Sequence, residues 1–348
     1  MMRRVRVGVV GLGRLGRFHA QNLAGRVPGA ELAIVVDAVE DTARSIGTEL
    51  GVRWSLSIDD LLGDDTIEAV VIATPTPLHA EMIQRVAESG KHIFCEKPLS
   101  FDVDPTVKAI ETAHSAGVKL QVGFHRRFDP DWRVAVDRME RGELGDVYLF
   151  RTSLRDMKPP SIEYIESSGG FFVDVTIHDF DTARWMIGEV DEVTSFGSSV
   201  AVPAIAEIGD IDTALVVLRF ASGALGVIDN SRAAGYGYEC STEVMGAKAT
   251  ARISHHRRAH VQWLTAGQAA EDWVVDFTER YPDAYRLEMD DFLGAVAEDR
   301  PVAVTGEDAL AAFTLCKAAE ESFRSGKTVR LEHHHSNGEV IYERAKTG

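Results

Sequence analysis

The chain has 348 residues, of which 45% are hydrophobic and 26% are charged, a balance typical of a globular protein with length for two domains. Its formal net charge of −17 argues against nucleic acid as a partner, because phosphate groups would meet a like-charged surface. The longest apolar runs, such as 69–73, are far shorter than the ~20 residues of a membrane helix, so no membrane partner is expected.

The first third of the chain alternates short apolar segments with segments of helical length. Strands are predicted at 5–10, 31–37, 69–73, 92–95 and 119–122. Helices are predicted at 16–25, 41–50, 78–89 and 103–116. This alternation is typical of βαβ units, a parallel sheet and right-handed crossovers. We therefore predict an N-terminal α/β domain of the Rossmann type.

After about Gly123, strand-like segments follow one another with few helices between them. Strands are predicted at 147–153, 192–199, 213–220, 224–231, 240–245, 249–254 and 273–277. Flanking helices are predicted at 132–141, 175–187, 283–297 and 306–325. Such a succession favours a mostly antiparallel sheet in an α+β domain. The resulting division is a first domain at 1–123, a second at 124–330 and a tail at 331–348.

The tail begins near Glu332, which three histidines at 333–335 follow. Because chain termini are commonly disordered, a mobile tail is the preferred interpretation over metal ligands or a tag remnant. Three widely spaced cysteines, Cys95, Cys240 and Cys316, argue against a disulfide framework and against a structural zinc site. The N-terminus lacks the pattern of a secretory signal, so a cytoplasmic protein is expected.

The run Gly11-Leu12-Gly13-Arg14-Leu15-Gly16 fits G-x-G-x-x-G and lies between the first predicted strand and the first predicted helix. In a dinucleotide site, one glycine permits the tight turn, the second lets pyrophosphate approach the backbone, and the third lets helix and strand pack closely. The free N–H groups of the helix N-terminus attract the phosphates. A tight turn alone is the alternative explanation for these glycines.

Asp37 strengthens the dinucleotide interpretation. It ends the second predicted strand, where a carboxylate can accept hydrogen bonds from the adenosine ribose hydroxyls. The same carboxylate would repel a 2′-phosphate, and neither Ala38 nor Val39 supplies a compensating cation. The sequence therefore predicts NAD rather than NADP as the cofactor.

Two further motifs suggest chemistry. Glu96-Lys97-Pro98 follows a strand of the first domain, at the edge where open parallel sheets bind their ligands. Asp174 and His178 are spaced i, i+4, which places both side chains on one face of a helix. The alternative for this pair is structural, with Asp174 capping a helix and His178 buried in a core.

The glycine motif, Glu96-Lys97-Pro98 and the Asp174–His178 pair together resemble the glucose–fructose oxidoreductase/inositol dehydrogenase/rhizopine-catabolism (Gfo/Idh/MocA) family. Segments 121–130, 176–181 and 235–239 resemble its inositol 2-dehydrogenase branch more narrowly. The resemblance extends to about Arg330. It implies a Rossmann domain followed by a substrate-binding and oligomerisation domain.

For the matching positions, the resemblance implies specific roles. Lys97 would lie beside the reacting hydroxyl and the nicotinamide, His178 would be the general base, and Asp174 would orient the histidine or a substrate hydroxyl. This agrees with the chemistry, because hydride leaves carbon more readily from an alkoxide-like oxygen. No metal is expected, since Lys97 can supply the positive charge.

The resemblance also implies contacts. Cofactor contacts are expected from the glycine-loop residues Gly11, Leu12, Gly13, Arg14 and Leu15 and from Asp37, Ala73, Thr74, His79, Glu96 and Lys97. Polyol substrate contacts are expected from Arg127, Tyr236 and Tyr285 beside Lys97, Asp174 and His178.

The leading hypothesis is NAD-dependent oxidation of myo-inositol or a related cyclitol to an inosose. Alternatives are another sugar, scyllo-inositol or an aminocyclitol precursor, because such rings differ only in hydroxyl direction. A non-catalytic NAD-binding regulator is the alternative from another class. A homodimer or homotetramer is expected, because an open-faced sheet in the second domain must cover its apolar face.

Overall fold

The computed structural model describes residues 3–336 and 339–344. Its contacts divide the chain into two units, one formed by residues 1–128 and 283–310 and the other by residues 129–282 and 311–348. Residues 283–310 therefore return to the first unit. A single division of the chain at residue 123 assigns them to the second domain. The return has a packing reason, since helix α11 (Pro282–Ala297) buries Met289, Phe292 and Leu293 in the hydrophobic core of the first unit.

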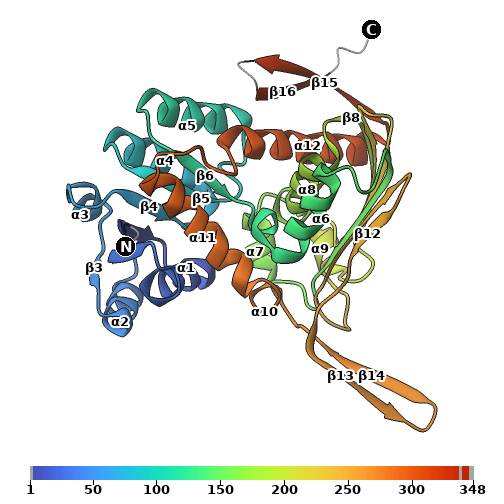
Figure 1. The fold of residues 1–348 in the computed structure, drawn as a ribbon, viewed down its shortest axis with the longest axis horizontal. Coiled ribbons are helices and arrows are strands. Elements are labelled where there is room, and N and C mark those ends of the chain that lie inside the picture. Colours follow the sequence, from blue (N-terminus) through green and yellow to red (C-terminus); the bar gives the residue numbers. More distant parts are fainter. Residues whose placement is uncertain (1–2, 337–338, 345–348) are drawn as a thin grey trace. The chain divides into compact units, whose positions relative to one another are not determined.

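The described part of the first unit is built around a parallel sheet with the strand order β3-β2-β1-β4-β5-β6 (Figure 1). Its strands are β1 (Val5–Val10), β2 (Ala30–Val36), β3 (Arg53–Ser55), β4 (Ala69–Ile72), β5 (His92–Glu96) and β6 (Leu120–Gly123). Its helices besides α11 are α1 (Arg14–Gly25), α2 (Glu40–Leu50), α3 (Asp59–Leu62), α4 (His79–Glu88) and α5 (Val103–Ser115), with short 3₁₀ turns η1 (Thr76–Leu78) and η2 (His125–Phe128). The predicted Rossmann sheet is confirmed.

Both faces of this sheet are covered. Val7 and Val9 of β1 belong to a core shared with α1 and α11, while Val70 of β4 and Ile93 of β5 are equally buried. Strands buried on both faces are apolar throughout, which explains the uninterrupted run at β4. The strand order reverses between β1 and β4, and the carboxyl ends of parallel strands at such a point form the usual ligand site of this architecture.

The described part of the second unit is built around a sheet with the strand order β12-β11-β7-β10-β9-β8-β15-β16. These strands are β7 (Val147–Arg155), β8 (Val190–Ser198), β9 (Thr213–Phe220), β10 (Leu225–Ser231), β11 (Glu239–Gly246), β12 (Thr250–Ile253), β15 (Val329–Ser336) and β16 (Glu339–Arg344). Strands β7 and β10 pair in parallel, and the other described neighbours are antiparallel. The predicted mostly antiparallel sheet is confirmed.

Helices cover one face of this sheet. The remaining helical segments are α6 (Pro130–Glu140), α7 (Ile162–Ser167), η3 (Phe172–Thr176), α8 (Ile177–Ile187), α9 (Ala204–Glu207), α10 (Phe277–Arg280) and α12 (Gly306–Ser325). Ser195 of β8 donates a hydrogen bond to the Ala319 carbonyl of α12. Its side chain is 4% exposed, so α12 covers this face of the sheet. On the opposite face, Phe196 and Leu215 are 63% and 49% exposed.

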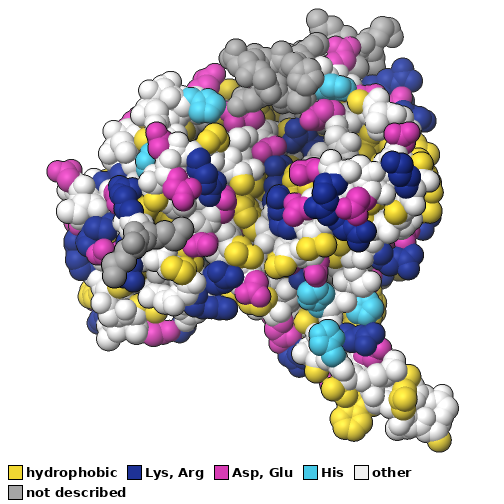
Figure 2. Space-filling model, in the orientation of Figure 1, with side chains coloured by type: hydrophobic (Ala, Val, Ile, Leu, Met, Phe, Trp, Pro, Cys, Tyr) yellow, Lys and Arg dark blue, Asp and Glu magenta, His cyan; other side chains and the backbone are white. Residues whose placement is uncertain are grey.

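A two-stranded hairpin, β13 (Arg257–Thr265) and β14 (Gln268–Trp273), extends from the second unit's sheet (Figure 1). Exposed apolar side chains lie along it in Figure 2, among them Val261, Trp263 and Leu264. The hairpin is absent from the sequence prediction because a strand that is exposed on both faces has no alternation of apolar and polar residues.

The predicted strand at 273–277 is wrong. Strand β14 ends at Trp273, and α10 begins at Phe277. The side chain of Asp276 accepts hydrogen bonds from the backbone N–H groups of Thr278 and Glu279. This N-cap starts a helix where the apolar residues alone had favoured a strand.

The expected mobile tail at 331–348 also differs from the structure in its described part. Strand β15 runs through this segment and pairs with β8 and β16. His333 lies 3.6 Å from Asp191, measured from Nδ1 to Oδ1, while the side chains at 334 and 335 fall outside the described ones. Among the helices that the structure describes, none combines the length and the apolar character needed to cross a membrane.

Candidate active site

The glycine loop between β1 and α1 shows a separate steric reason for each glycine. Gly11 has φ of +85°, and a Cβ there would lie 2.6 Å from the backbone nitrogen of Thr74. A Cβ on Gly16 would lie 1.8 Å from the Gly11 carbonyl oxygen, so this helix packs directly on the loop. Gly13 has no atom within 4 Å of an added Cβ and is exposed. The loop therefore leaves open space at the one glycine where a pyrophosphate approaches in such sites.

Asp37, just after β2, is joined to this loop. Its Oδ2 accepts a hydrogen bond from the Leu12 backbone N–H at 2.7 Å, and its Oδ1 accepts one from Val39 N–H at 2.8 Å. These two N–H donors fix the orientation of the carboxyl group at the loop. The residue remains half-buried, so its carboxylate is accessible at the strand end where a ribose hydroxyl is expected. Leu12 is buried, Arg14 is exposed and Leu15 is half-buried at the start of α1.

His79, the first residue of α4, connects the loops after β4 and β5. Its Nδ1 lies 2.8 Å from the Pro98 carbonyl oxygen and its Nε2 lies 2.7 Å from the Thr74 carbonyl oxygen. Burial lowers the pKa of His79, which favours the neutral ring. A neutral ring has one N–H and can donate to only one of the two carbonyls at a time. His79 thus holds together the segments that contain Ala73, Thr74 and Lys97.

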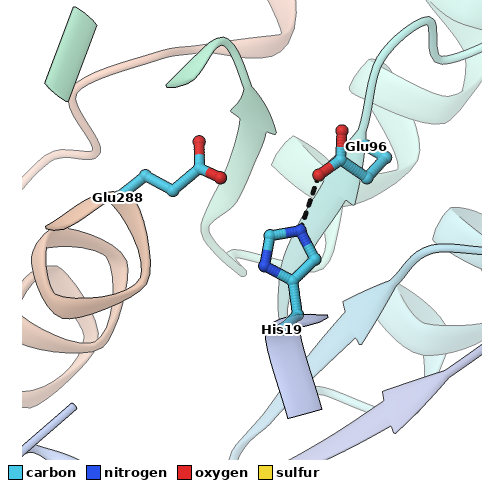
Figure 3. A group of neighbouring side chains, drawn as sticks. All are labelled: His19, Glu96 and Glu288. Carbon is cyan, nitrogen blue, oxygen red and sulfur yellow. Dashed lines mark hydrogen bonds and ion pairs between the residues drawn. The ribbon is translucent and has the colours of Figure 1, made fainter. Parts of the chain in front are cut away.

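Glu96 ends β5, and Lys97 follows it half-buried. The Glu96 side chain is buried and its Oε1 lies 2.7 Å from Nε2 of His19 on α1 (Figure 3). Glu288 of α11 lies beside this pair. His19 and Glu288 are absent from the sequence prediction, although His19 is one helical turn beyond Gly16, where a polar residue on a buried helix face is a usable signal.

Two of the predicted substrate residues also belong to the first unit. Arg127 forms a bidentate ion pair with Asp308, with nitrogen–oxygen distances of 3.2 and 3.0 Å. Tyr285 of α11 is 4% exposed, and its ring stacks on His125 at a centroid distance of 4.6 Å. Neither arrangement tests a substrate contact, and both roles stay predictions.

Asp174 and His178 belong to the second unit. Asp174 lies in the π-helical turn η3, and His178 lies in α8, which continues it, so the helix begins earlier than the predicted residue 175. Single π-helical turns occur frequently at functional sites. Both side chains are half-buried.

The Asp174 carboxylate is held from two sides. Its Oδ1 accepts a hydrogen bond from the Tyr164 hydroxyl at 3.0 Å, and its Oδ2 accepts one from Nη1 of Arg232 at 2.8 Å. Arg232 is 1% exposed, so its charge is almost entirely removed from water and is paired with the Asp174 carboxylate. Burial raises the pKa of Tyr164, which keeps its hydroxyl a donor at neutral pH. Neither Tyr164 nor Arg232 was predicted, because they approach Asp174 only in the folded chain.

Tyr236 follows β10 and is 48% exposed. Its hydroxyl donates to Glu239 and accepts a hydrogen bond from Nη1 of Arg155 at 3.0 Å. Its ring meets Trp273 edge-on at a centroid distance of 5.0 Å. The phenol is therefore held in place on an exposed part of the second unit, and its contact with substrate stays a prediction.

Comparison with known proteins matches both parts of the chain to one oxidoreductase family. Residues 5–124 match the family described as "Oxidoreductase family, NAD-binding Rossmann fold", and residues 136–331 match "Oxidoreductase family, C-terminal alpha/beta domain". The first unit is thus an NAD-binding domain, in agreement with the open space at Gly13 and the carboxylate of Asp37.

Several relatives match nearly the full chain. The chain is 41% identical to the myo-inositol 2-dehydrogenase of Thermotoga maritima, with 94% of this chain and 99% of that protein covered. It is 40% identical to the NAD-dependent scyllo-inositol 2-dehydrogenase of Bacillus subtilis, with 95% and 98% covered. The scyllo-inositol dehydrogenase of Lactobacillus casei, solved with bound NAD(H) and scyllo-inositol, superimposes with a TM-score of 0.88 at 29% identity over 94% of this chain and 99% of that chain. This chain therefore belongs to the Gfo/Idh/MocA oxidoreductase family.

Proposed function

We propose that this protein oxidises a ring hydroxyl of myo-inositol or a closely related cyclitol to the ketone, with NAD as hydride acceptor. The observation that carries the proposal is the Asp174 carboxylate, which Arg232 and Tyr164 hold four residues before His178. This held carboxylate and His178 lie in a chain that also has an NAD-binding domain, with Lys97 following the end of a strand. The names of the relatives supply the substrate class.

In this proposal, the glycine loop and Asp37 would hold NAD, which would supply the hydride acceptor for the ring carbon. His178 takes the proton of the reacting hydroxyl as general base. The ammonium group of Lys97 stabilises the negative charge that develops on that oxygen. Asp174 orients His178 or a neighbouring substrate hydroxyl. Arg127, Tyr236 and Tyr285 would supply further contacts to the polyol, and Ala73, Thr74, His79 and Glu96 would hold the nicotinamide half of the cofactor.

The test is NADH formation, followed by absorbance, with the purified protein, NAD and myo-inositol. Turnover is expected with NAD, and Lys97→Ala is expected to lower kcat by about 10²-fold or more, as removal of one charge-stabilising group does elsewhere. Lys108→Ala, on an exposed position of α5, is the matched control and should leave kcat unchanged. Equal rates for the Lys97 variant and wild type would exclude the role given to Lys97.

A second substrate deserves the same assay. Two of the relatives named above act on scyllo-inositol according to their names, so the kcat/KM ratio for the two inositols identifies the preferred stereoisomer. Aldoses and aminocyclitol precursors complete the panel. Tight NAD binding without turnover on any of them would favour the non-catalytic regulator.

We also propose that two or more copies associate through the second unit's sheet. The exposed face of β8 to β10 carries Phe196, Leu215, Val217 and Leu225, each at least 43% exposed. Contiguous apolar side chains on a sheet face are typical of a subunit interface.

A cytoplasmic location is proposed as well. Cell fractionation of the native host tests it.

A further inference from the structure

A buried polar cluster in the first unit joins Glu96 to two residues, His19 and Glu288, that have no part in the mechanism proposed above. His19 of α1, Glu96 of β5 and Glu288 of α11 each place one nitrogen or oxygen within 4.8 Å of the others (Figure 3). His19 and Glu288 are 0% exposed and Glu96 is 6% exposed. Burying two ionised carboxyl groups away from water costs free energy unless their charges are paired or neutralised. The protonation state of the cluster therefore needs an explanation.

Glu96 is held tightly at the end of β5. Its Oε1 is hydrogen-bonded to Nε2 of His19 at 2.7 Å. On the other side lies Gly123 of the neighbouring strand β6, where an added Cβ would be 2.9 Å from Oε2 of Glu96. The carboxylate thus occupies space that glycine leaves open. Because Lys97 is the next residue, the position of the Glu96 side chain constrains the backbone that carries the Lys97 amine.

Glu288 completes the cluster from the opposite side. Figure 3 shows its carboxyl group directed toward the His19 ring and Glu96. Among the described residues, neither carboxyl oxygen of Glu288 has a hydrogen-bond partner or an ion pair. The titratable groups around it are His19 on α1 and Glu96 on β5, with His125 of η2 stacked on Tyr285 one helical turn earlier. Burial, and then the charge of Glu96, raise the pKa of Glu288 well above its ordinary value.

The hydrogen-bond pattern is consistent with one added proton. If Glu96 is a carboxylate, His19 must donate from Nε2, which leaves Nδ1 as an acceptor in the neutral ring. Nδ1 of His19 is buried and has no partner among the described residues. A protonated Glu288 supplies a donor to the cluster, whereas an ionised Glu288 would add a second negative charge beside Glu96.

We propose that Glu288 is kept as a neutral carboxylic acid and, with His19, positions the Glu96 carboxylate and the adjoining Lys97. His19 and Glu288 are positioning residues, since they act on the reaction through Glu96 and Lys97. The kinetic consequences rest on the proposed function, whereas the protonation state of Glu288 does not.

The first experiment measures protonation without any substrate. The infrared spectrum of the full-length wild-type protein at neutral pH is expected to contain the carbonyl stretching band of a buried protonated carboxylic acid. Subtraction of the Glu288→Gln spectrum should isolate this band, while subtraction of the exposed-site control Glu298→Gln should not. A difference spectrum with only carboxylate bands would overturn the proposal. So would one equivalent of metal ion retained by the purified protein, because a metal requires the ionised ligand.

The second experiment measures kcat and KM for the substrate found in the panel above. Glu288→Gln preserves shape and neutrality, so kcat should stay within about threefold of wild type, whereas Glu288→Ala should lower kcat by about 10-fold or more, because loss of orientation costs rate. Gly123→Ala, which displaces Glu96 without changing any charge, should reproduce the loss in kcat with a smaller change in KM. Equal losses in Glu288→Gln and Glu288→Ala would overturn the proposal.

The two experiments separate this inference from the proposed function. If wild type turns over no polyol, the proposed function fails, while the infrared comparison still decides the state of Glu288. If Glu288→Ala does not fold, the Gln and Gly123→Ala variants still test the positioning role. Glu288→Met is the control for space-filling, because methionine fills the site without a hydrogen-bonding group. If Glu288→Met is as impaired as Glu288→Ala while Glu288→Gln retains activity, the side chain acts through its polar group and not through its volume.

Discussion

At the scale of single residues, we predict that Asp37 decides which nucleotide the first unit prefers. Its two oxygens accept hydrogen bonds from Leu12 and Val39 N–H groups, so the negative charge is fixed beside the glycine loop. Asp37→Ser should raise the KM for NAD by about 10-fold or more, since a hydrogen bond to a charged group contributes ~1.5–3 kcal/mol. The same variant should use NADP better than wild type does, because the repulsion of a 2′-phosphate is gone.

Steady-state kinetics with both nucleotides check this prediction. Asp41→Asn, at an exposed acid in the first turn of α2, is the control for a general loss of negative charge. An unchanged ratio of kcat/KM for NAD over NADP in the Asp37 variant would contradict the assignment.

Arg232 is the second residue whose effect can be predicted. It is almost fully buried and pairs with Asp174, so Arg232→Met leaves a half-buried carboxylate without its cation. Breaking a buried pair from one side costs about 3–5 kcal/mol, and the free energy of unfolding should fall by that order. Tyr164→Phe removes only one hydrogen bond to the same carboxylate and should cost about 1 kcal/mol.

Urea unfolding of both variants tests this order, and kcat is measured beside it. Both variants should lose activity, with the larger loss in Arg232→Met. A Tyr164→Phe variant less stable than Arg232→Met would show that the ion pair does not hold Asp174.

At the scale of elements, two glycines of the loop between β1 and α1 are predicted to affect different properties, Gly13 the binding of NAD and Gly16 the stability of the fold. Gly13→Ala meets no atom within 4 Å, so the variant should fold with nearly unchanged stability but bind NAD at least about 10-fold more weakly, because the methyl group occupies the space meant for pyrophosphate. Gly16→Ala meets the Gly11 carbonyl oxygen at 1.8 Å and should be destabilised by about 1–3 kcal/mol, the usual cost of overpacking.

Thermal unfolding and isothermal titration with NAD distinguish the two effects. The prediction requires a split between them, with weak binding in a stable Gly13 variant and reduced stability in the Gly16 variant. Equal melting temperatures for the two variants would contradict the steric assignment.

At the scale of the whole molecule, the exposed face of the second unit's sheet predicts association. Phe196 and Leu215 pair across β8 and β9 on that face, at 63% and 49% exposure. Phe196→Asp combined with Leu215→Lys should shift the sedimentation coefficient toward that of the monomer. Val134→Lys, at an exposed apolar position of α6, is the matched control and should leave the oligomer intact. A wild-type monomer at micromolar concentration would exclude the proposed interface.

The sequence alone determined the elements in which local pattern and burial agree. Strand β9 and helix α12 have the predicted bounds, Thr213–Phe220 and Gly306–Ser325. The Rossmann sheet follows from the alternation of strands and helices, and the family follows from motifs a few residues long. The elements depend on hydrophobic periodicity and the motifs on short runs of residues, and both are local properties of the chain.

Only the tertiary structure decided which distant residues meet. Arg232 reaches Asp174 across 58 residues, and Glu288 joins His19 and Glu96 because α11 returns to the first unit. The hairpin β13–β14 and the cap at Asp276 also escaped prediction, the first because exposed strands lack periodicity and the second because one cap outweighed an apolar run. Long-range pairing of polar groups depends on burial, and burial exists only once the chain has folded.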